Sequence, residues 1–418
     1  MSVAPVSPLI LTFPKARHVV EEHAARIPEP ANELVDLLAA HGRVLAEPVL
    51  ADRDIPPFPR STRDGYAILS AHLTQVPAAF EVVGEVKAGE KLDNIPARLE
   101  PGQAVSIMTG APVPAGADAV VMVEFTTTKG SQVEVSRRVI PGENIVPCGA
   151  EARQGSTLLS RGTRLNEIGI GLAASAGKSR VQVYRRPQVA VLTTGDEIVG
   201  IAATPGPTQI RNSNSYSLAV QILRAGGQPR LLPIAPDESD RLRRLIELGM
   251  ESDLLLMTGG VSMGRYDLVE QVFSELGAEF FFTGAQIQPG RPVVFGRCGA
   301  AAEASTMTYF FGLPGNPVST MVTFELFVRP MIEALAGQTG AKLTFVHARL
   351  RSDVRVKTGL TRFLPALLTG EFENSAVELI PWQGSGDIAA TARSNCFLVV
   401  PSNRDHIAAG EWVAVLQR

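Results

Sequence analysis

The stretch that decides the fold is Leu254-Leu255-Leu256-Met257-Thr258-Gly259-Gly260-Val261-Ser262-Met263-Gly264-Arg265-Tyr266-Asp267, in which a short apolar run leads into a glycine-rich loop. A run of this length that ends at a turn signal is typical of a strand buried in a sheet. The glycines let backbone amides approach an anionic ligand before the next helix begins. The stretch therefore predicts a strand, a ligand-binding loop and a helix, in that order.

The same alternation continues on both sides of this stretch. Further strands are expected at 189–192, near 231 and at 309–311, and helices at about 215–225, 239–248, 268–276 and 318–336. Strands that alternate with helices in this way form a parallel sheet covered on both faces. We therefore expect an α/β domain with a parallel sheet over residues 181–338.

The flanking segments have different patterns. A helical pattern is expected over 15–47, short β-branched runs separated by glycine and proline lie between 66 and 138, and a second helical pattern covers 166–176. Short strands return beyond 342. We predict a multidomain α/β plus β chain, with an elongated helical and β linker domain (1–54 and 139–180), an inserted small β domain (55–138) and a C-terminal β-barrel domain (339–418).

Composition excludes several classes of protein. The chain has 418 residues, 45% of them apolar, and a net charge of −3, so it can fold as several domains but has no global positive field for nucleic acid or an acidic membrane. No apolar run approaches the roughly 20 residues of a membrane span, and the proline-interrupted N-terminus does not predict a signal peptide. The three cysteines are far apart and the six histidines form no His-Glu-x-x-His motif, so we expect buried thiols, no zinc site and a cytoplasmic location.

Three loops follow predicted strands, where open α/β sheets bind their ligands. The first, Thr193-Thr194-Gly195-Asp196-Glu197, carries two acids, and the second is the glycine-rich loop quoted above. The third is Gly312-Leu313-Pro314-Gly315-Asn316-Pro317-Val318-Ser319, in which Asn316 suits an N-cap and Pro317 the first helical position. Each loop alone has an ordinary structural reading as a turn. Because three occur in order with acids and hydroxyls at their tips, we expect them to converge on one site.

Two further motifs carry a resemblance. Ser61-Thr62-Arg63-Asp64-Gly65-Tyr66-Ala67 is similar to the Ser-Ala-Met-Asp-Gly-Tyr-Ala element of the molybdopterin molybdenumtransferase family and of the gephyrin E domain. Ile107-Met108-Thr109-Gly110-Ala111-Pro112-Val113-Pro114 matches the same family almost letter for letter. Together with the glycine-rich loops, these matches run from about residue 54 to 394 in family order.

The resemblance implies an activity. Members of this family bind adenylated molybdopterin, hydrolyse the adenylate with Mg²⁺ and insert molybdate, releasing AMP in molybdenum cofactor biosynthesis. The resemblance also implies a homodimer whose site joins the inserted domain of one subunit to the α/β domain of the other, so that Asp64 acts across the interface. A molybdopterin adenylyltransferase and molybdoenzyme apoproteins are the implied partners.

Family position also implies roles for individual residues. Four acids are expected to be catalytic and to hold Mg²⁺ or orient the nucleophile: Asp64, Glu197, Asp237 and Asp267. Asp237 could instead simply start the next helix. The expected substrate-binding residues are Thr109, Thr194, Gly195, Gly259, Gly260, Ser262, Arg291, Pro314, Gly315, Asn316, Ser319, Arg362 and Ser385. For Arg362 and Ser385 the reading as ordinary surface polar residues stays open.

The chain also departs from the family pattern. The family's Lys-Pro-Gly-Lys-Pro turn, which supplies charge for molybdate, here reads Gln288-Pro289-Gly290-Arg291-Pro292, so one charge is lost and Arg291 keeps the other. Glu151 stands where a family Asp is common, and Arg63 replaces a common Met. These changes leave open a non-catalytic scaffold paralogue that carries pterin or cofactor. The related adenylyltransfer reaction is disfavoured, because it belongs to proteins with only the α/β domain.

Overall fold

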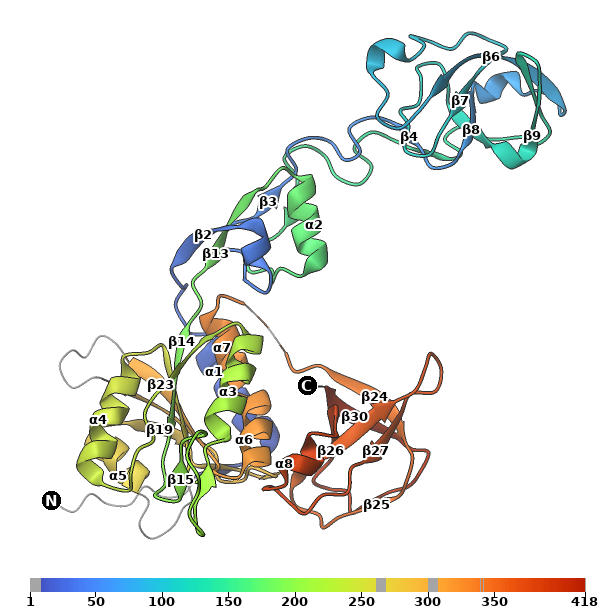
Figure 1. The fold of residues 1–418 in the computed structure, drawn as a ribbon. Coiled ribbons are helices and arrows are strands. Elements are labelled where there is room, and N and C mark those ends of the chain that lie inside the picture. The colour runs from blue at the N-terminus through green and yellow to red at the C-terminus, as the bar shows by residue number, and fades with distance from the viewer. Residues whose placement is uncertain (1–8, 261–267, 300–306, 339, 341, 418) are drawn as a thin grey trace.

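The computed structural model describes residues 9–260, 268–299, 307–338, 340 and 342–417. The chain is elongated (Figure 1), with an α/β domain and a C-terminal β domain at one end, a small β domain at the other end, and a linker domain between them. The chain passes through the linker domain twice on its way to and from the small β domain.

The small β domain is a sheet inserted between the two passes of the linker. Its elements are β4 (Arg60–Ser61), β5 (Gly65–Ile68), η2 (Ser70–His72), β6 (Ala78–Val86), η3 (Leu92–Asn94), β7 (Gln103–Ile107), β8 (Ala119–Met122), η4 (Val123–Phe125), β9 (Thr126–Lys129) and β10 (Gln132–Val135). Six strands form one sheet in the order β8-β5-β7-β6-β10-β9. Neighbouring residues such as Val120 and Val121 belong to two different buried clusters, because successive side chains point to opposite faces. This confirms the strands expected from the β-branched runs.

The linker domain is built from strand pairs and one helix. Its elements are β2 (Asn32–Asp36), η1 (Leu37–Ala40), β3 (Val49–Leu50), β12 (Thr157–Leu159), α2 (Glu167–Ser175) and β13 (Arg180–Tyr184). Strand β11 (Ile145–Val146), which precedes β12 in the chain, pairs with β4 of the small β domain. Strand β13 pairs antiparallel with β2, and β12 with β3. Asn166 caps α2 by accepting a hydrogen bond from the Gly169 amide at 2.9 Å, so the helix expected at 166–176 is confirmed.

The single helical pattern expected over 15–47 is wrong. Helix α1 (Phe13–Ala24) ends before Pro28 and Pro30, which cannot continue a helix. Leu34, Leu37 and Leu38, whose spacing favoured that helix, lie on β2 and η1, and Leu38 is 85% exposed. Helix α1 itself packs against the α/β domain through Ala16 and Val20, although its residues were expected to belong to the linker domain.

The α/β domain contains β14 (Gln188–Thr193), β15 (Ile198–Val199), β16 (Ile210–Arg211), α3 (Asn214–Ala225), β17 (Gln228–Leu231), α4 (Ser239–Met250), β18 (Leu254–Thr258), α5 (Leu268–Glu275), β19 (Glu279–Phe282), β22 (Val294–Gly299), β23 (Met307–Leu313), α6 (Pro317–Thr323), the π-helix η5 (Phe324–Val328) and α7 (Arg329–Leu335). The six-stranded sheet has the order β17-β14-β18-β23-β22-β19. The first four strands are parallel, as the sequence predicts, whereas β22 runs antiparallel to β23 and to β19. The antiparallel β19–β22 pair was not foreseen.

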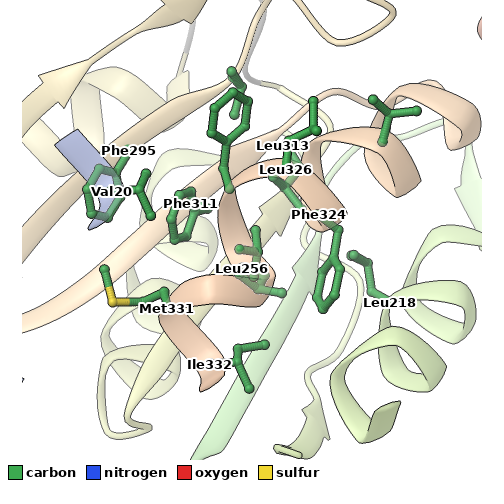
Figure 2. Packing of buried hydrophobic residues seen from close by; sticks show 14 of the residues in the cluster. Val20, Leu218, Leu256, Phe295, Phe311, Leu313, Phe324, Leu326, Met331 and Ile332 are labelled. Carbon is green, nitrogen blue, oxygen red and sulfur yellow. The ribbon is translucent and has the colours of Figure 1, made fainter. Parts of the chain in front are cut away.

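Helices cover both faces of this sheet (Figure 1). On one face, α4 and α5 pack against Leu192 and Met257. On the other, α1, α3, α6, η5 and α7 enclose the large apolar cluster of Figure 2, in which Leu256 and Phe311 of the sheet meet Leu218, Phe324 and Ile332 of the helices. Because both faces are buried, the central strands are continuous apolar runs rather than alternating ones.

The C-terminal domain is a closed barrel. Its elements are β24 (Phe345–Leu350), β25 (Val354–Arg355), β26 (Thr361–Thr369), β27 (Ala376–Leu379), α8 (Ile388–Thr391), β28 (Cys396–Val400), β29 (His406–Ile407) and β30 (Trp412–Gln417). Five strands follow one another as β26-β27-β24-β30-β28, and β28 pairs back onto β26. The predicted barrel tail is thereby confirmed.

Two short strands tie other parts of the chain to these domains. Strand β1 (Ile10–Leu11) pairs with β20 (Gly284–Ala285), and β21 (Ile287–Gln288) pairs with β26 of the barrel. The barrel is therefore joined to the α/β domain by strand pairing as well as by the chain connection.

Over the described ranges, we find no helix both long and apolar enough to cross a bilayer. The three cysteines carry free thiols; Cys298 and Cys396 are buried as expected, whereas Cys148 is half-buried.

Candidate active site

The three predicted loops begin level with one another at one edge of the sheet. They follow β14, β18 and β23, whose last residues are in register as Thr193, Thr258 and Leu313. The Asn214 side chain, at the start of α3, donates hydrogen bonds to Thr258 Oγ1 at 2.9 Å and to the Gly315 carbonyl at 2.7 Å. One amide thus ties the second strand to the third loop.

The loops are in direct contact where glycine stands. Gly259 has φ +88°, and a Cβ there would lie 2.3 Å from the Thr194 carbonyl oxygen. A Cβ on Gly315 would lie 3.6 Å from the Cα of Gly259. No side chain fits between the first and second loops, so their backbones are in direct contact at this edge of the sheet.

Acidic side chains gather beside the first loop. The Asp237 amide donates to Asp196 Oδ1 at 3.2 Å, and the Glu197 carboxylate folds back over Gly195, where a Cβ would meet Glu197 Oε2 at 2.5 Å. Burial raises the pKa of Asp237 above its ordinary value, and the negative charges of Asp196 and Glu197 raise that pKa further. The first loop therefore presents an excess of negative charge.

Two expected acid and hydroxyl groups cannot be placed. Asp267 and Ser262 lie outside the described residues. Within the described ranges, no three histidine, cysteine or acidic side chains form a ready-made metal site. Glu197 and Asp237 are thus the expected metal-binding acids that lie together at this edge.

The third loop is covered by the barrel domain. Asn316 precedes α6, but its side chain donates to Ser385 Oγ at 2.9 Å rather than capping the helix. The Val318 amide donates to the Ser385 carbonyl at 3.0 Å, and Ser319 is buried. The loop before α8 and the start of α6 therefore form one structure across the domain boundary.

The turn Gln288-Pro289-Gly290-Arg291-Pro292 packs against α6. A Cβ on Gly290 would lie 2.5 Å from Thr323 Cγ2 and 3.5 Å from the Ser319 carbonyl oxygen, so the turn packs on this helix. Pro314, in the loop before α6, is buried, whereas Arg291 is exposed.

Arg362 enters from the barrel strand β26, which places it opposite Gln288. Its Nε donates to Gln288 Oε1 at 2.8 Å, and Nη1 donates to the Leu360 carbonyl at 3.2 Å. Only 6% of Arg362 is exposed, and this burial lowers its pKa. The reading of Arg362 as an ordinary surface residue is therefore wrong.

Asp64 lies on the inserted domain, in the turn between β4 and β5. Its Oδ1 accepts hydrogen bonds from the Thr109 amide at 2.7 Å and from the Thr109 hydroxyl at 2.8 Å, and these bonds lower the pKa of Asp64. Buried Ser61 organises the same turn by donating to the Arg63 carbonyl at 2.6 Å. Asp64 is thus held ionised on an exposed surface.

One chain does not bring all these residues together. The inserted domain that carries Asp64 and Thr109 lies at the opposite end of the molecule from the α/β edge (Figure 1). The remaining described candidates gather at the α/β edge and its junction with the barrel. A single chain therefore holds two separate parts of the expected site.

Sequence reasoning missed the connecting residues. Asn214 was not singled out, and Thr109 was expected to bind substrate although its amide and hydroxyl bind Asp64. Asn214 starts α3, and its partners Thr258 and Gly315 follow in other strand-loop units. Its two hydrogen bonds therefore become visible only when the order of the strands in the sheet is known. Glu151, noted as a departure, forms an ion pair with Arg60 at 2.7 Å.

Known families match almost the whole chain. Residues 11–177 match the MoeA N-terminal region (domain I and II), residues 190–334 a probable molybdopterin binding domain, and residues 347–417 the MoeA C-terminal region (domain IV). The molybdopterin molybdenumtransferase of Nostoc sp. is 36% identical over 92% of this chain and 88% of its own length. That of Bacillus subtilis is 34% identical over 90% and 87%.

Solved structures agree with these matches. Two structures of the molybdopterin biosynthesis MoeA protein from Pyrococcus horikoshii are similar to this chain. One has a TM-score of 0.71 and 30% identity, covering 98% of this chain and 99% of that chain. The other has a TM-score of 0.77 and 28% identity, covering 98% and 100%.

Proposed function

This chain belongs to the molybdopterin molybdenumtransferase (MoeA) family, and from that premise we propose that it inserts molybdate into adenylated molybdopterin and releases AMP. The observation that carries this proposal is the junction at the α/β edge. There, an acidic loop, glycine backbones, the start of α6 and the buried Arg362 lie within one connected structure. Such a junction has groups for a phosphate on one side and for an oxyanion on the other.

The acids fit Mg²⁺. Magnesium prefers oxygen ligands and takes few protein carboxylates, with phosphate and water completing its coordination. Burial raises the pKa of Asp237, repulsion from Asp196 and Glu197 raises it further, and a bound cation would relieve that repulsion. We propose that Glu197 and Asp237, together with Asp267 and the partner subunit's Asp64, hold the ion. When bound, Mg²⁺ would supply neutralisation of the phosphate oxygens during adenylate hydrolysis.

The protein's own groups carry the other tasks. The backbone at Gly195, Gly259, Gly260 and Gly315, together with Thr194, would bind the nucleotide-linked pterin, since exposed amides of glycine-rich loops suit its phosphate. Asp64 Oδ1 is committed to Thr109, so Oδ2 is the oxygen that would orient the attacking water. Arg362, Arg291, Ser319, Asn316 and Ser385 would receive molybdate, since donors and positive charge stabilise an oxyanion.

The site requires a second subunit. The inserted domain, whose β4–β5 turn contains Asp64, lies at the opposite end of the molecule from the α/β domain that carries the acidic loop (Figure 1). Helix α3 exposes Tyr216, Val220 and Leu223, at 47%, 64% and 48% exposure, with the spacing of one helix face. We propose that this face lies in a homodimer interface and that the symmetric partner delivers its Asp64 to the α/β edge. A molybdopterin adenylyltransferase would supply the substrate, and apo-molybdoenzymes would take the product.

The proposal is tested by measuring AMP release. Purified chain, adenylated molybdopterin, Mg²⁺ and molybdate should release AMP, and Asp64→Ala should abolish most of that release. Asp93→Ala, at an exposed acid of the same domain, is the matched control and should keep parent activity. Failure of the parent to release AMP at any molybdate concentration would refute the enzyme. Tight pterin binding without turnover, unchanged by Asp64→Ala, would instead support the scaffold alternative. A parallel reaction with tungstate compares the two metals.

A further inference from the structure

Gln288 is the residue that distinguishes the oxyanion side of this site from the family pattern. We propose that Gln288 is a positioning residue that fixes the Arg362 guanidinium while leaving its positive charge uncompensated, so that a doubly charged tetrahedral oxyanion can neutralise it. The inference deepens the proposed function, on which it rests for the identification of that oxyanion as molybdate.

The charge of Arg362 differs from that of the other buried arginines. Arg17 and Arg43 are 7% and 9% exposed, and each forms an ion pair, with Glu21 at 2.7 Å and with Glu33 at 2.5 Å. Arg362 is buried to the same degree, at 6% exposure, yet within the described ranges no carboxylate lies within ion-pair distance of it. Burying a charge is unfavourable unless an opposite charge compensates it. Arg362 therefore sits in an environment that an anion would complete.

The hydrogen bonds of Arg362 orient it without neutralising it. Nε donates to the Gln288 amide oxygen, and Nη1 donates to the Leu360 carbonyl. Both acceptors are neutral, and in the described part of the chain Nη2 has no hydrogen-bond acceptor. The guanidinium is thus fixed at one edge with a donor still available, which is the arrangement that suits a multidentate oxyanion.

The choice of glutamine follows from this geometry. A glutamate at position 288 would accept the same hydrogen bond but would neutralise Arg362. A lysine there would offer no acceptor and would place a second cation beside the guanidinium. Only a neutral side chain with an acceptor of this length both orients Arg362 and keeps its charge for a ligand.

The position of Gln288 places this charge beside the rest of the site. Strand β21 carries Gln288 directly into the turn whose Gly290 packs on α6 next to Ser319. The exposed Arg291 follows in the same turn. An oxyanion at Arg362 would therefore lie beside the groups that the proposed reaction assigns to molybdate.

The test measures molybdate binding to the full chain by calorimetry, without pterin. Gln288→Glu should weaken molybdate binding by roughly 10- to 100-fold, because the new carboxylate would pair with the Arg362 guanidinium in place of molybdate. Gln288→Ala should weaken it less, because the charge stays and only its orientation is lost. In an Arg362→Gln background, Gln288→Glu should cause no further loss, since Gln288 acts through Arg362. Thermal unfolding of each variant reports whether it is folded.

The matched control is Gln228→Glu, which makes the same charge change at an exposed position on the edge strand β17 and should leave binding unchanged. Three outcomes would each overturn the inference. Gln288→Glu binds molybdate as tightly as the parent does; Gln288→Glu weakens binding just as much in the Arg362→Gln background; or the parent binds no molybdate. If the binding pattern holds but no AMP is released, only the proposed reaction fails. If AMP is released and Gln288→Glu leaves the KM for molybdate unchanged, only this inference fails.

Discussion

At the α/β edge several candidate groups are bonded to one another, and Thr194, Ser319 and Arg362 among them are buried, whereas Asp64 is exposed on the inserted domain and its carboxylate accepts hydrogen bonds from Thr109. At the edge, Asn214 connects two loops, the loop before α8 covers α6, and Gln288 fixes Arg362. The edge is thus ordered by its own contacts, while the Asp64 turn is a small unit on a separate domain. The two regions are separate structural units, so a substitution in one of them can impair the proposed site without disturbing the other.

The largest expected effect concerns whether Asp64 and Glu197 of one site come from different subunits. Asp64→Ala and Glu197→Gln should each lower kcat by roughly 10²–10⁴-fold, the usual loss when a positioned acid or base is removed. If the partner supplies Asp64, an equal mixture of the two variants after subunit exchange should recover roughly a quarter of parent activity, since a mixed dimer has one intact site. AMP release before and after exchange measures this recovery.

Two controls decide the interpretation of the mixing experiment. Each variant exchanged with itself should gain nothing. If the mixture also gains nothing although mass analysis shows mixed dimers, the site does not join Asp64 and Glu197 from different subunits.

The second prediction concerns rigidity. Gly259→Ala should destabilise the protein by at least about 3 kcal/mol, because the methyl group would overlap the Thr194 carbonyl oxygen in addition to the strain of a positive φ. Gly110→Ala, beside Thr109, shares the positive φ of +82° but would meet only Ala88 Cβ at 3.8 Å. It should lose about 1 kcal/mol.

Urea unfolding of both variants measures this contrast. Equal losses at the two glycines would show that the α/β edge is no more tightly built than the Asp64 turn. A loss of AMP release in Gly110→Ala with unchanged stability would locate the effect in Asp64 positioning instead.

The third prediction sharpens the role of the Asp64 turn. Thr109→Val removes the hydroxyl donor but keeps the backbone one, so kcat/KM should fall roughly 2- to 12-fold. The hydrogen bonds of Thr109 lower the pKa of Asp64. Their weakening should raise that pKa and move the acidic limb of the pH-rate profile to higher pH. Thr109→Ser keeps the hydroxyl and should restore the parent profile; an unchanged profile in Thr109→Val would contradict the assigned role.

Sequence patterns predicted the regular parts of this fold well. The sequence correctly predicted elements in three places: the alternating strands and helices from 188 to 336, the β-branched runs of the inserted domain and the short strands of the tail. It could do so because the local spacing of apolar residues reflects which faces of an element are buried. The failure over residues 15–47 has a physical cause: Leu34 and Leu38 have helical spacing, but Pro28 and Pro30 had already ended the helix, and β2 pairs with β13 about 150 residues away.

The site divides along the same line. Loops that follow parallel strands could be expected to converge, since the strand order places their ends together. The bonds of Arg362 to Gln288 and of Thr109 to Asp64 could not be predicted, because each joins residues that are distant in sequence and depends on side-chain geometry. The departure at Gln288 was visible, but its meaning required the burial of Arg362.

The smallest expected effect concerns charge at the α/β edge. Burial and the charges of Asp196 and Glu197 raise the pKa of Asp237 in the folded chain. Asp237 therefore binds a proton more tightly in the folded state than in the unfolded state. Its contribution to stability is present at low pH and is lost as the pH rises through the pKa of Asp237 in the folded state. Asp196→Asn keeps the acceptor for the Asp237 amide but removes one repulsive charge, so it should be slightly more stable than the parent at neutral pH.

The gain should disappear as pH falls below the pKa of an unfolded Asp, where Asp237 is protonated in both states. Urea unfolding at several pH values with a chelator present measures it. Asp93→Asn, which removes an exposed charge from the inserted domain, should show no such pH-dependent gain. The comparison of the two regions would break if both variants gained equally, because the excess negative charge would then belong to the whole molecule and not to the edge that is proposed to hold a cation.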